Sequence, residues 1–237
     1  MTSKILIFGS SGDVGIEICK LFLKKNFYVY FTCSNKKSYA NTKKKLVTFS
    51  KSFNSQKFSG LICDVSKESS LEKVIKKVLK KDSIDVVVNS IGIFSYDTIF
   101  RYKKEELMEF IKLNTLPTIL INKFILKYKK QNKKKINVLT IGSSSAYDGF
   151  EKTISYSASK HALLSAIKSI NKETYNNKIF NTLVNPGSIK SRMGKKIKNQ
   201  KYSTFINASE IADFVYSLSK INPPGIVEDV FYKRIIK

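Results

Sequence analysis

Residues 5–15 read ILIFGSSGDVG, a run of four apolar residues followed by glycines at positions 9, 12 and 15. Continuous apolar residues are typical of a buried parallel strand. Gly9 permits a tight turn after the strand, Gly12 lets a pyrophosphate approach the backbone, and Gly15 lets the next helix pack close to the strand. The segment therefore predicts a strand, a turn and a helix that bind a nucleotide. The alternative is a glycine-rich turn without a ligand.

The N-terminus of the predicted helix is the expected phosphate site. Its first N–H groups have no partner within the helix, and its macrodipole favours anions. Two serine hydroxyls in the turn would add hydrogen-bond donors. The expected nucleotide contacts of this segment are Gly9, Ser10, Ser11, Gly12, Val14 and Gly15.

Apolar runs and amphipathic stretches alternate along the rest of the chain. Strands are expected at 5–8, 28–33, 61–65, 84–89, 136–141, 180–184 and 226–232. Helices are expected at 13–25, 67–81, 103–130, 156–176 and 208–219, where apolar residues recur at spacings of three and four. Such alternation produces right-handed crossovers between parallel strands. We therefore expect an α/β fold: a single doubly wound Rossmann domain over residues 1–237, with a parallel sheet of about seven strands and helices on both faces.

Two polar stretches interrupt this pattern. Residues 35–57 are rich in Lys, Ser and Asn and only weakly periodic, so a short helix with loops is expected there. Residues 187–207 are basic and follow the end of a predicted strand. Because functional loops gather at the carboxyl edge of such sheets, this second stretch is expected to border the site.

The composition sets further limits. The chain has 237 residues, of which 42% are hydrophobic, enough for a sizeable core. No apolar run approaches the roughly 18–20 residues needed to span a bilayer. No charged leader with an apolar centre precedes the first strand, so a cytoplasmic location is expected.

The cysteines and the single histidine argue against metal chemistry. Cys19, Cys33 and Cys63 form no CxxC pair and lie in apolar segments, so buried reduced thiols are expected. His161 alone cannot build a multi-histidine site, and no second histidine is available for a Ser-His-Asp triad. No metal is expected.

The net charge of +25 raises the question of nucleic-acid binding. Only three of the basic residues are arginines, and the lysines are spread along nearly every segment. Recognition of phosphates and bases favours arginine forks. The pattern therefore favours solvated lysine faces over a specific nucleic-acid site. Non-specific binding of the protein to nucleic acid is expected at low salt.

Tyr156 and Lys160 are four residues apart in a predicted helix, so both side chains lie on one face. A nearby ammonium favours phenolate and would lower the pKa of the tyrosine. Such a tyrosine can exchange a proton with a substrate oxygen near neutral pH. Chance alone predicts about two such pairs in a chain this rich in Tyr and Lys. The chain has three, the others being Tyr39–Lys43 and Tyr216–Lys220, so context must decide.

The context resembles the short-chain dehydrogenase/reductase family. YSASKHALL at 156–164 is similar to the active-site helix of that family, and VLTIGSSSAY at 138–147 to its serine segment. FIKLNT at 110–115, NSIG at 89–92, CDVS at 63–66 and NPGSIKS at 185–191 match further landmarks in the same order. Together they cover essentially the whole chain.

The resemblance implies a role for each matching residue. Tyr156 would protonate the substrate carbonyl, and Lys160 would lower the tyrosine pKa and hold the nicotinamide ribose. Ser143, with Ser144 and Ser145 as local competitors, would hydrogen-bond the substrate oxygen. Asn114 would support a water-linked proton path. The further cofactor contacts it implies are Asp64, Val65, Asn89, Gly92, Pro186, Gly187, Ile189 and Ser191.

Two features depart from the common branch of the family. The glycine spacing of three and three resembles the extended branch, whose added C-terminal substrate domain has no room here, since only about 50 residues follow Pro186. Phe8 stands where the family usually has threonine, which puts one turn contact in doubt.

The end of the second strand bears on the choice of cofactor. An acidic residue there binds the ribose 2′-hydroxyl of NAD and repels a 2′-phosphate. The sequence reads FTCSNKK, with no acidic residue, and Ser34, Asn35, Lys36 and Lys37 would accept a phosphate. NADP(H) is therefore expected, with NAD(H) as the alternative.

Residues 188–201 fall where the family has its substrate lid, so 187–207 is expected to form a lid loop. This loop is dense in basic residues and includes a glycine, Gly194, as an expected hinge. Its basic residues are Lys190, Arg192, Lys195, Lys196, Lys198 and Lys201. They suggest an anionic or carrier-bound substrate, with Arg192 as a bidentate ligand for its carboxylate or phosphate. The alternative is the general lysine bias of the chain.

These observations lead to one functional interpretation. The chain is expected to be an NADP(H)-dependent oxidoreductase that interconverts a carbonyl and an alcohol, such as a 3-oxoacyl or keto-sugar reductase. The first alternative is a nucleotide-binding regulatory or scaffold protein of the same fold without turnover. The second is a protein that binds RNA or a membrane surface through its positive charge. A homodimer or homotetramer is expected from the resemblance.

Overall fold

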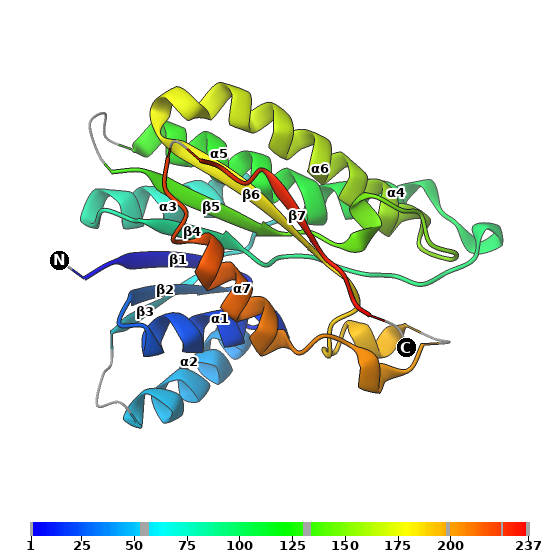
Figure 1. Ribbon diagram of the computed structural model, residues 1–237, viewed down its shortest axis with the longest axis horizontal. Helices are drawn as coiled ribbons and strands as arrows, with labels where there is room; N and C mark the ends of the chain where they lie inside the picture. The colour runs from blue at the N-terminus through cyan, green and yellow to red at the C-terminus, as the bar shows by residue number, and fades with distance from the viewer. Residues whose placement is uncertain (1, 53–56, 130–133, 198–199, 224, 236–237) are drawn as a thin grey trace.

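The computed structural model describes residues 2–52, 57–129, 134–197, 200–223 and 225–235. Its centre is a parallel sheet of seven strands in the order β3-β2-β1-β4-β5-β6-β7 (Figure 1). The strands are β1 Lys4–Phe8, β2 Tyr28–Cys33, β3 Phe58–Ile62, β4 Val86–Asn89, β5 Ile136–Ile141, β6 Ile179–Pro186 and β7 Asp229–Tyr232. The expected doubly wound parallel sheet is confirmed.

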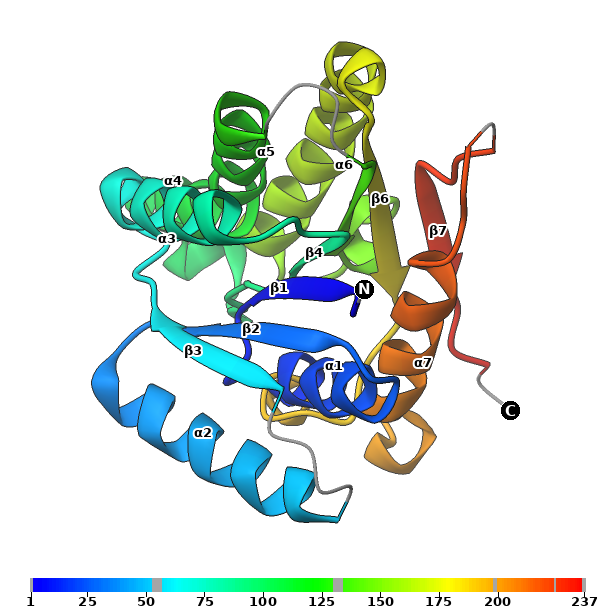
Figure 2. The ribbon, with the colours of Figure 1, turned by 90° about the vertical axis from the view of Figure 1, so that its left-hand side faces the viewer.

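Helices cover both faces of the sheet (Figure 2). On one face lie α1 Asp13–Lys24, α2 Lys36–Lys51 and α7 Ala208–Leu218, and their apolar side chains pack on β1 and β2. On the other face lie α3 Glu68–Lys81, α4 Lys104–Phe110, α5 Leu116–Tyr128 and α6 Ile154–Thr174. Burial of apolar surface on both faces explains the apolar runs Ile5–Phe8 in β1 and Val86–Val88 in β4.

The strand order reverses beside β1. The chain passes from β1 outward to β3 and then returns to the other side of β1 as β4. In doubly wound sheets the ligand crevice lies at the carboxyl ends of the strands where this reversal occurs. The glycine-rich loop after β1 and the loop after β4 are therefore adjacent at that edge, and the Ser90 hydroxyl donates to the Phe8 carbonyl across 2.8 Å.

The third strand lies earlier in the chain than the sequence predicts. The pattern favours a strand at 61–65, whereas β3 begins at Phe58 and ends at Ile62. It lies at the edge of the sheet and pairs only with β2, so it needs no continuous apolar run. Asp64 lies beyond it, where its carboxylate accepts from the backbone and hydroxyl of Ser66 and closes a turn.

The polar stretch after β2 is also corrected. In place of a short helix with loops, α2 is a helix of 16 residues. Its N-terminus has a capping box, in which the Asn35 side chain accepts from the Ser38 backbone and the Ser38 hydroxyl accepts in return. A capping box and one narrow buried stripe, which includes Leu46, hold a helix whose other faces are solvated lysines.

All three cysteines are buried and free, and burial raises the pKa of Cys19 to about 12 and of Cys63 to about 11. Within the described residues, no helix is both long and apolar enough to cross a membrane. The same residues contain no cluster of three or more His, Cys, Asp or Glu side chains suited to a metal ion.

Candidate active site

Two glycines shape the loop after β1. Gly9 has a φ of +79°, in the left-handed region that favours glycine, and a Cβ there would lie 2.9 Å from the Ser90 carbonyl carbon. A Cβ on Gly15 would lie 2.3 Å from the Gly9 carbonyl oxygen. Only the absence of side chains allows α1 to start against this turn, in agreement with the sequence prediction.

The N-terminus of α1 suits an anion. Gly12 is the N-cap residue and provides no side-chain cap, so the first helical N–H groups remain available. A Cβ on Gly12 would meet only the Gly9 carbonyl oxygen, at 3.3 Å, so the outer side of the turn is open for a ligand. The backbone here therefore fits a dinucleotide pyrophosphate.

Two polar side chains expected at the cofactor instead hold the scaffold. Ser10 is fully buried; its hydroxyl donates to the Ile7 carbonyl and accepts from the Thr32 backbone. Asn89 is also buried, where it donates to the Thr118 hydroxyl and accepts from the Ile91 backbone. The expectation that the Ser10 hydroxyl binds phosphate is corrected, because this hydroxyl joins the end of β1 to β2 through its bonds with Ile7 and Thr32.

A cavity of about 700 Å³ opens beside the glycine-rich loop. Its walls come from the start of α1, the loops after β4, β5 and β6, and the first two turns of α6. The predicted site residues that line it are Gly12, Val14, Gly15, Gly92, Ser143, Tyr156, Lys160, Pro186, Gly187, Ile189 and Ser191. The structure thus brings together Ser143, Tyr156 and Lys160 with the residues predicted to lie beside the nicotinamide, although they are far apart in the sequence.

Tyr156, Lys160 and Ser143 converge at the floor of this cavity. Tyr156 and Lys160 lie one turn apart on α6, with the Lys160 Nζ 5.7 Å from the centroid of the tyrosine ring. The Ser143 side chain lies close enough to Tyr156 to lower the pKa of the tyrosine. The Lys160 Nζ donates to the Ile141 carbonyl at 3.3 Å. All three side chains are at least nine-tenths buried.

Burial changes the titration of this group from what the sequence suggests. It raises the pKa of Tyr156, and the Ser143 side chain only partly opposes that effect. Burial also lowers the pKa of Lys160 to about 8. The expectation that Lys160 lowers the tyrosine pKa is therefore corrected, because desolvation has the largest effect on the pKa of both groups.

Ser143 is positioned by a residue from the next strand. The Asn185 Oδ1 accepts from the Ser143 backbone at 3.1 Å, and the Asn185 Nδ2 donates to the Tyr147 hydroxyl. A Cβ on Gly142 would lie 2.0 Å from the Asn185 Oδ1, so this contact needs glycine at that position. The Ser143 Oγ accepts from the Ser145 backbone at 3.1 Å, which fixes its direction.

Asn114 lies where a helix widens. The sequence predicts a single helix over 103–130, but a π-helical turn at Ile111–Thr115 separates α4 from α5. Pro117 lies in the first turn of α5 and has no N–H to donate to the preceding turn. Asn114 accepts from the Ile93 backbone at 2.8 Å and donates to the Ser159 hydroxyl at 2.9 Å. It therefore ties the loop after β4 to the catalytic helix, behind the cavity wall.

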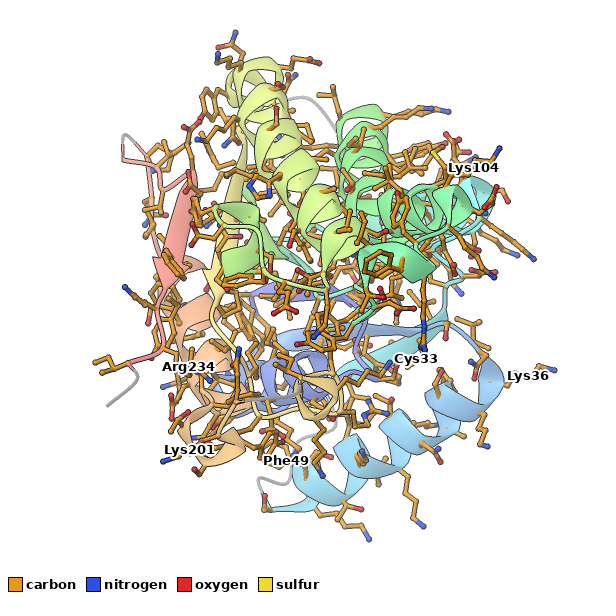
Figure 3. The ribbon with its side chains drawn as sticks, turned by 90° about the vertical axis from the view of Figure 1, so that its right-hand side faces the viewer. Cys33, Lys36, Phe49, Lys104, Lys201 and Arg234 are labelled. Atoms are coloured by element: carbon orange, nitrogen blue, oxygen red, sulfur yellow. The ribbon has the colours of Figure 1, made fainter. Side chains whose placement is uncertain are left out.

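The predicted adenine-side residues lie outside the cavity lining. Ser34, Asn35 and Lys36 are exposed between β2 and α2, and Asn35 caps α2. Figure 3 shows Lys36 at the start of α2, near the end of β2 at Cys33. Asp64 and Val65 are half-buried in the next loop, and the hydrogen bond from Ser66 keeps the pKa of Asp64 below its ordinary value.

The loop over 187–207 contains two short helical turns, at Gly194–Lys196 and Tyr202–Thr204, and a bridge between Ile189 and Ile206 closes its base. A Cβ on Gly194 would lie 2.1 Å from the Ile189 carbonyl oxygen, and the Gly194 N–H donates to Ser191. The glycine therefore permits a tight turn, and a hinge at this position stays a prediction. Lys198 lies outside the described residues.

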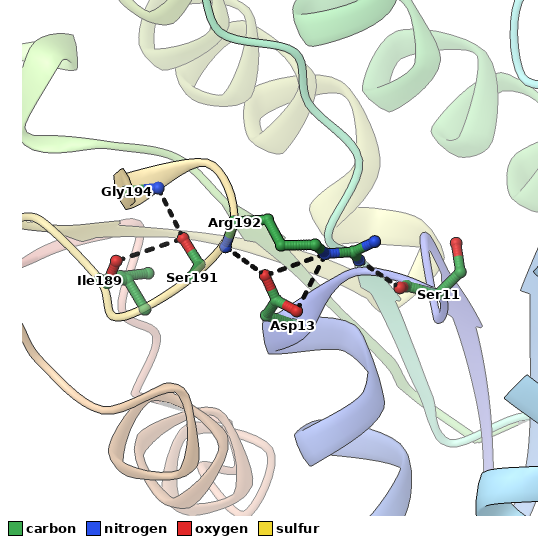
Figure 4. Close-up of polar contacts among 6 residues, drawn as sticks. All are labelled: Ser11, Asp13, Ile189, Ser191, Arg192 and Gly194. Atoms are coloured by element: carbon green, nitrogen blue, oxygen red, sulfur yellow. Dashed lines mark hydrogen bonds and ion pairs between the residues drawn. The ribbon is translucent and has the colours of Figure 1, made fainter. Parts of the chain in front are cut away.

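Arg192 has a different partner from the one the sequence suggests. Its guanidinium donates to the Asp13 carboxylate at 3.2 Å and to the Ser11 carbonyl at 2.8 Å (Figure 4). Its backbone N–H also donates to Asp13, at 2.6 Å. The prediction of a free arginine for a substrate anion is therefore corrected: Arg192 joins the lid loop to the start of α1.

An aromatic wall of the cavity has no counterpart in the sequence analysis. Phe94, Tyr96 and Phe150 line the cavity from the loops after β4 and β5. The Phe94 ring meets Tyr156 edge to face, with centroids 4.9 Å apart. Irregular loops show no periodicity, so only the closeness of their supporting strand ends could have indicated these residues.

Replacing Lys160 by Met is expected to flatten the pH dependence of stability. Because the folded pKa of about 8 lies below the ordinary value of 10.5, the unfolded chain binds more protons between those pH values. Wild-type stability should therefore rise with pH across that window, by roughly 3 kcal/mol from this residue. Urea unfolding at pH 7, 8.5 and 10 measures the rise.

Lys172→Met on the exposed side of the same helix is the matched control. It should keep the wild-type rise with pH. A Lys160→Met curve that runs parallel to both would contradict the buried ammonium.

A family model described as short chain dehydrogenase matches residues 3–202. A 3-oxoacyl-acyl-carrier-protein reductase of Buchnera aphidicola subsp. Acyrthosiphon pisum is 26% identical over 222 residues, which are 90% of this chain and 88% of that protein. Carbonyl reductase family member 4 of Xenopus laevis is 28% identical over 207 residues, 87% of this chain and 84% of that protein. Among solved structures, ElxO with NADP bound has a TM-score of 0.85 at 24% identity, covering 99% of this chain and 97% of that one. An actinorhodin polyketide ketoreductase with NADPH has a TM-score of 0.85 at 19% identity, covering 98% and 95%.

Proposed function

Because this chain belongs to the short-chain dehydrogenase family, we propose that it is an NADP(H)-dependent oxidoreductase that interconverts a carbonyl and an alcohol. The observation that carries this proposal is the meeting of Tyr156, Ser143 and Lys160 in one cavity with the open N-terminus of α1. A phosphate-binding backbone beside a buried proton donor is what hydride transfer to a carbonyl requires.

The proposed mechanism assigns each side chain a task. The nicotinamide, when bound, supplies or accepts the hydride. Ser143 hydrogen-bonds the substrate oxygen and holds it beside the Tyr156 hydroxyl, which donates its proton as negative charge develops there. Lys160 supplies positive charge near the tyrosine ring and stabilises the phenolate that remains. Asn114 ties the loop after β4 to α6 and is proposed to support a water-linked path that returns the proton.

Burial suits Tyr156 to the role of proton donor. A raised pKa keeps the phenol protonated before the reaction, and the ammonium becomes important once the phenolate forms. Lys160, with a pKa of about 8, is close to half charged at mildly basic pH. Reduction is therefore expected to slow as pH rises above 8.

The cavity supports an apolar carbonyl substrate with an anionic or carrier-bound end. Phe94, Tyr96 and Phe150 offer an aromatic wall, and Lys196 lines the cavity from the lid loop. The relatives named as 3-oxoacyl-acyl-carrier-protein reductases act on substrates of that kind by their names, which supports the same class here.

The choice of NADP(H) is supported by the charge at the end of β2 and by NADP or NADPH in the similar structures named above. We expect NADPH to bind about tenfold or more tightly than NADH, because one charge-assisted contact contributes roughly 1.5–3 kcal/mol. Fluorescence titration of both dinucleotides measures the ratio.

Lys36→Met should reduce that preference, whereas Lys44→Met, a matched exposed lysine on the same helix, should leave it unchanged. Equal affinities in the wild-type protein, or tighter NADH, would contradict this role for Ser34–Lys37.

The proposed activity is tested with NADPH and a panel of ketones, acyl thioesters and keto-sugars, followed by nicotinamide absorbance. Turnover with any of them supports an enzyme. Tight NADPH binding without turnover across the panel would favour the alternative, a regulatory or scaffold protein of the same fold. We also propose a homodimer or homotetramer, which sedimentation would test.

A further inference from the structure

A carboxylate lies at the end of the helix proposed to bind phosphate. Asp13 is the first residue of α1, directly after the uncapped Gly12, and it lines the cavity. A helix N-terminus favours one anion, and the Asp13 side chain already provides it. A pyrophosphate arriving at the same helix end would meet that negative charge.

The Arg192 guanidinium, which comes from the lid loop, neutralises the Asp13 carboxylate. Its Nε donates to both Asp13 oxygens, at 3.2 and 3.4 Å, and one terminal nitrogen donates to the Ser11 carbonyl at 2.8 Å. These contacts place the guanidinium over the loop that is proposed to hold the phosphates (Figure 4).

The lid loop is built to deliver Arg192 to this point. The Ser191 hydroxyl accepts from the Gly194 backbone at 2.9 Å and donates to the Ile189 carbonyl at 3.2 Å. The lack of a side chain at Gly194 lets the backbone of this turn approach the Ile189 carbonyl closely. Together with the contact from the Arg192 backbone to Asp13, the turn fixes both the main chain and the side chain at the start of α1.

We propose that Arg192 is a positioning residue for the dinucleotide: it neutralises Asp13 and so lets the N-terminus of α1 accept a pyrophosphate. This rests on the proposed dinucleotide-binding function. The turn at residues 189–194 places Arg192 beside Asp13, so the affinity for the dinucleotide depends on the position of that turn.

The Arg192–Asp13 ion pair is exposed to solvent, so its proposed role is to neutralise charge and not to stabilise the fold. The Arg192 and Asp13 side chains are 72% and 35% exposed. An ion pair of that kind adds little to folding stability. Its effect on a second anion a few ångströms away remains substantial at low salt, because the repulsion acts close to the backbone.

The test measures the dissociation constant of NADPH by fluorescence titration at low and high salt. The proteins compared are the wild type, Arg192→Met, Asp13→Asn and the double variant. Arg192→Met should weaken binding by about tenfold at low salt, and the deficit should shrink as salt rises. Asp13→Asn should bind as tightly as the wild type or more tightly. In the double variant the second change should restore binding to within about twofold of Asp13→Asn.

Charge and structure are separated by further variants. Arg192→Lys keeps the charge and should bind NADPH within about threefold of the wild type, whereas Arg192→Gln should match Arg192→Met. Arg101→Met removes one of the three arginines from an exposed site elsewhere and should change nothing. Thermal melting of each variant verifies folding.

A double variant as weak as Arg192→Met would overturn the proposal, because Arg192 would then act on the dinucleotide directly or only by holding the lid. A wild-type protein that binds neither NADPH nor NADH would instead overturn the proposed function itself. Normal binding by Arg192→Met at low salt would overturn the inference while leaving the function intact.

Discussion

Replacing Tyr156 by Phe is expected to lower kcat at least about 100-fold, because the reaction loses its positioned proton donor. The ring remains, so its edge-to-face contact with Phe94 and the packing of α6 should persist. The dissociation constant of NADPH should stay within about threefold of the wild type, since no charge is removed. Single-turnover absorbance measurements with the best substrate of the panel, together with fluorescence titration, separate these two quantities.

Tyr216→Phe provides a matched control. Tyr216 and Lys220 have the same spacing, and the Lys220 Nζ lies 4.9 Å from the tyrosine ring, yet the pair lies away from the cavity. Its kcat should equal that of the wild type. Near-normal turnover by Tyr156→Phe would show that the proton comes from another group.

Replacing Gly15 by Ala is expected to abolish dinucleotide binding and to lower the free energy of unfolding by about 1–3 kcal/mol. The added Cβ would lie 2.3 Å from the Gly9 carbonyl oxygen and 2.8 Å from the Ser90 hydroxyl. The carbonyl belongs to the backbone and cannot rotate away, so α1 must move from the turn. That movement displaces the N–H groups proposed to hold phosphate. Urea unfolding and NADPH titration measure the two effects.

Gly149→Ala is the matched control, because a Cβ at that position would have no atom within 4 Å and the Gly149 φ is outside the left-handed region. It should leave both quantities unchanged. Wild-type stability and affinity in Gly15→Ala would mean that the close approach of α1 to the turn is not needed.

Local patterns explain why much of the fold is predictable from the sequence. A strand buried on both faces is mostly apolar, and the predicted bounds of β2 and β5 are the observed ones. Predictions fail where an element buries too few residues to leave a clear apolar pattern. β3 is an edge strand with little need for apolar residues, and α2 has one narrow buried stripe. The break between α4 and α5 also escapes prediction, because the π turn Ile111–Thr115 contains no glycine or proline to mark it.

The candidate site divides in the same way. Gly9 and Gly15 act within a single turn, where backbone conformation and close approach depend on adjacent residues, and the structure agrees with the sequence. The one-turn spacing of Tyr156 and Lys160 is likewise fixed by helix geometry. The pKa of Tyr156 could not be foreseen, since it depends on how completely the surrounding loops exclude water.

The sequence by itself determined the glycine-rich turn, the helix that carries Tyr156 and Lys160 one turn apart, and the alternation that produces a doubly wound sheet, because each follows from spacings of a few residues. Only the tertiary structure decided the partners of side chains that meet across the cavity. Arg192 binds Asp13, which lies 179 residues earlier, and Asn185 holds Ser143, 42 residues earlier. Such contacts depend on where parallel strands end relative to one another, and the backbone path between them leaves no periodic trace in the sequence.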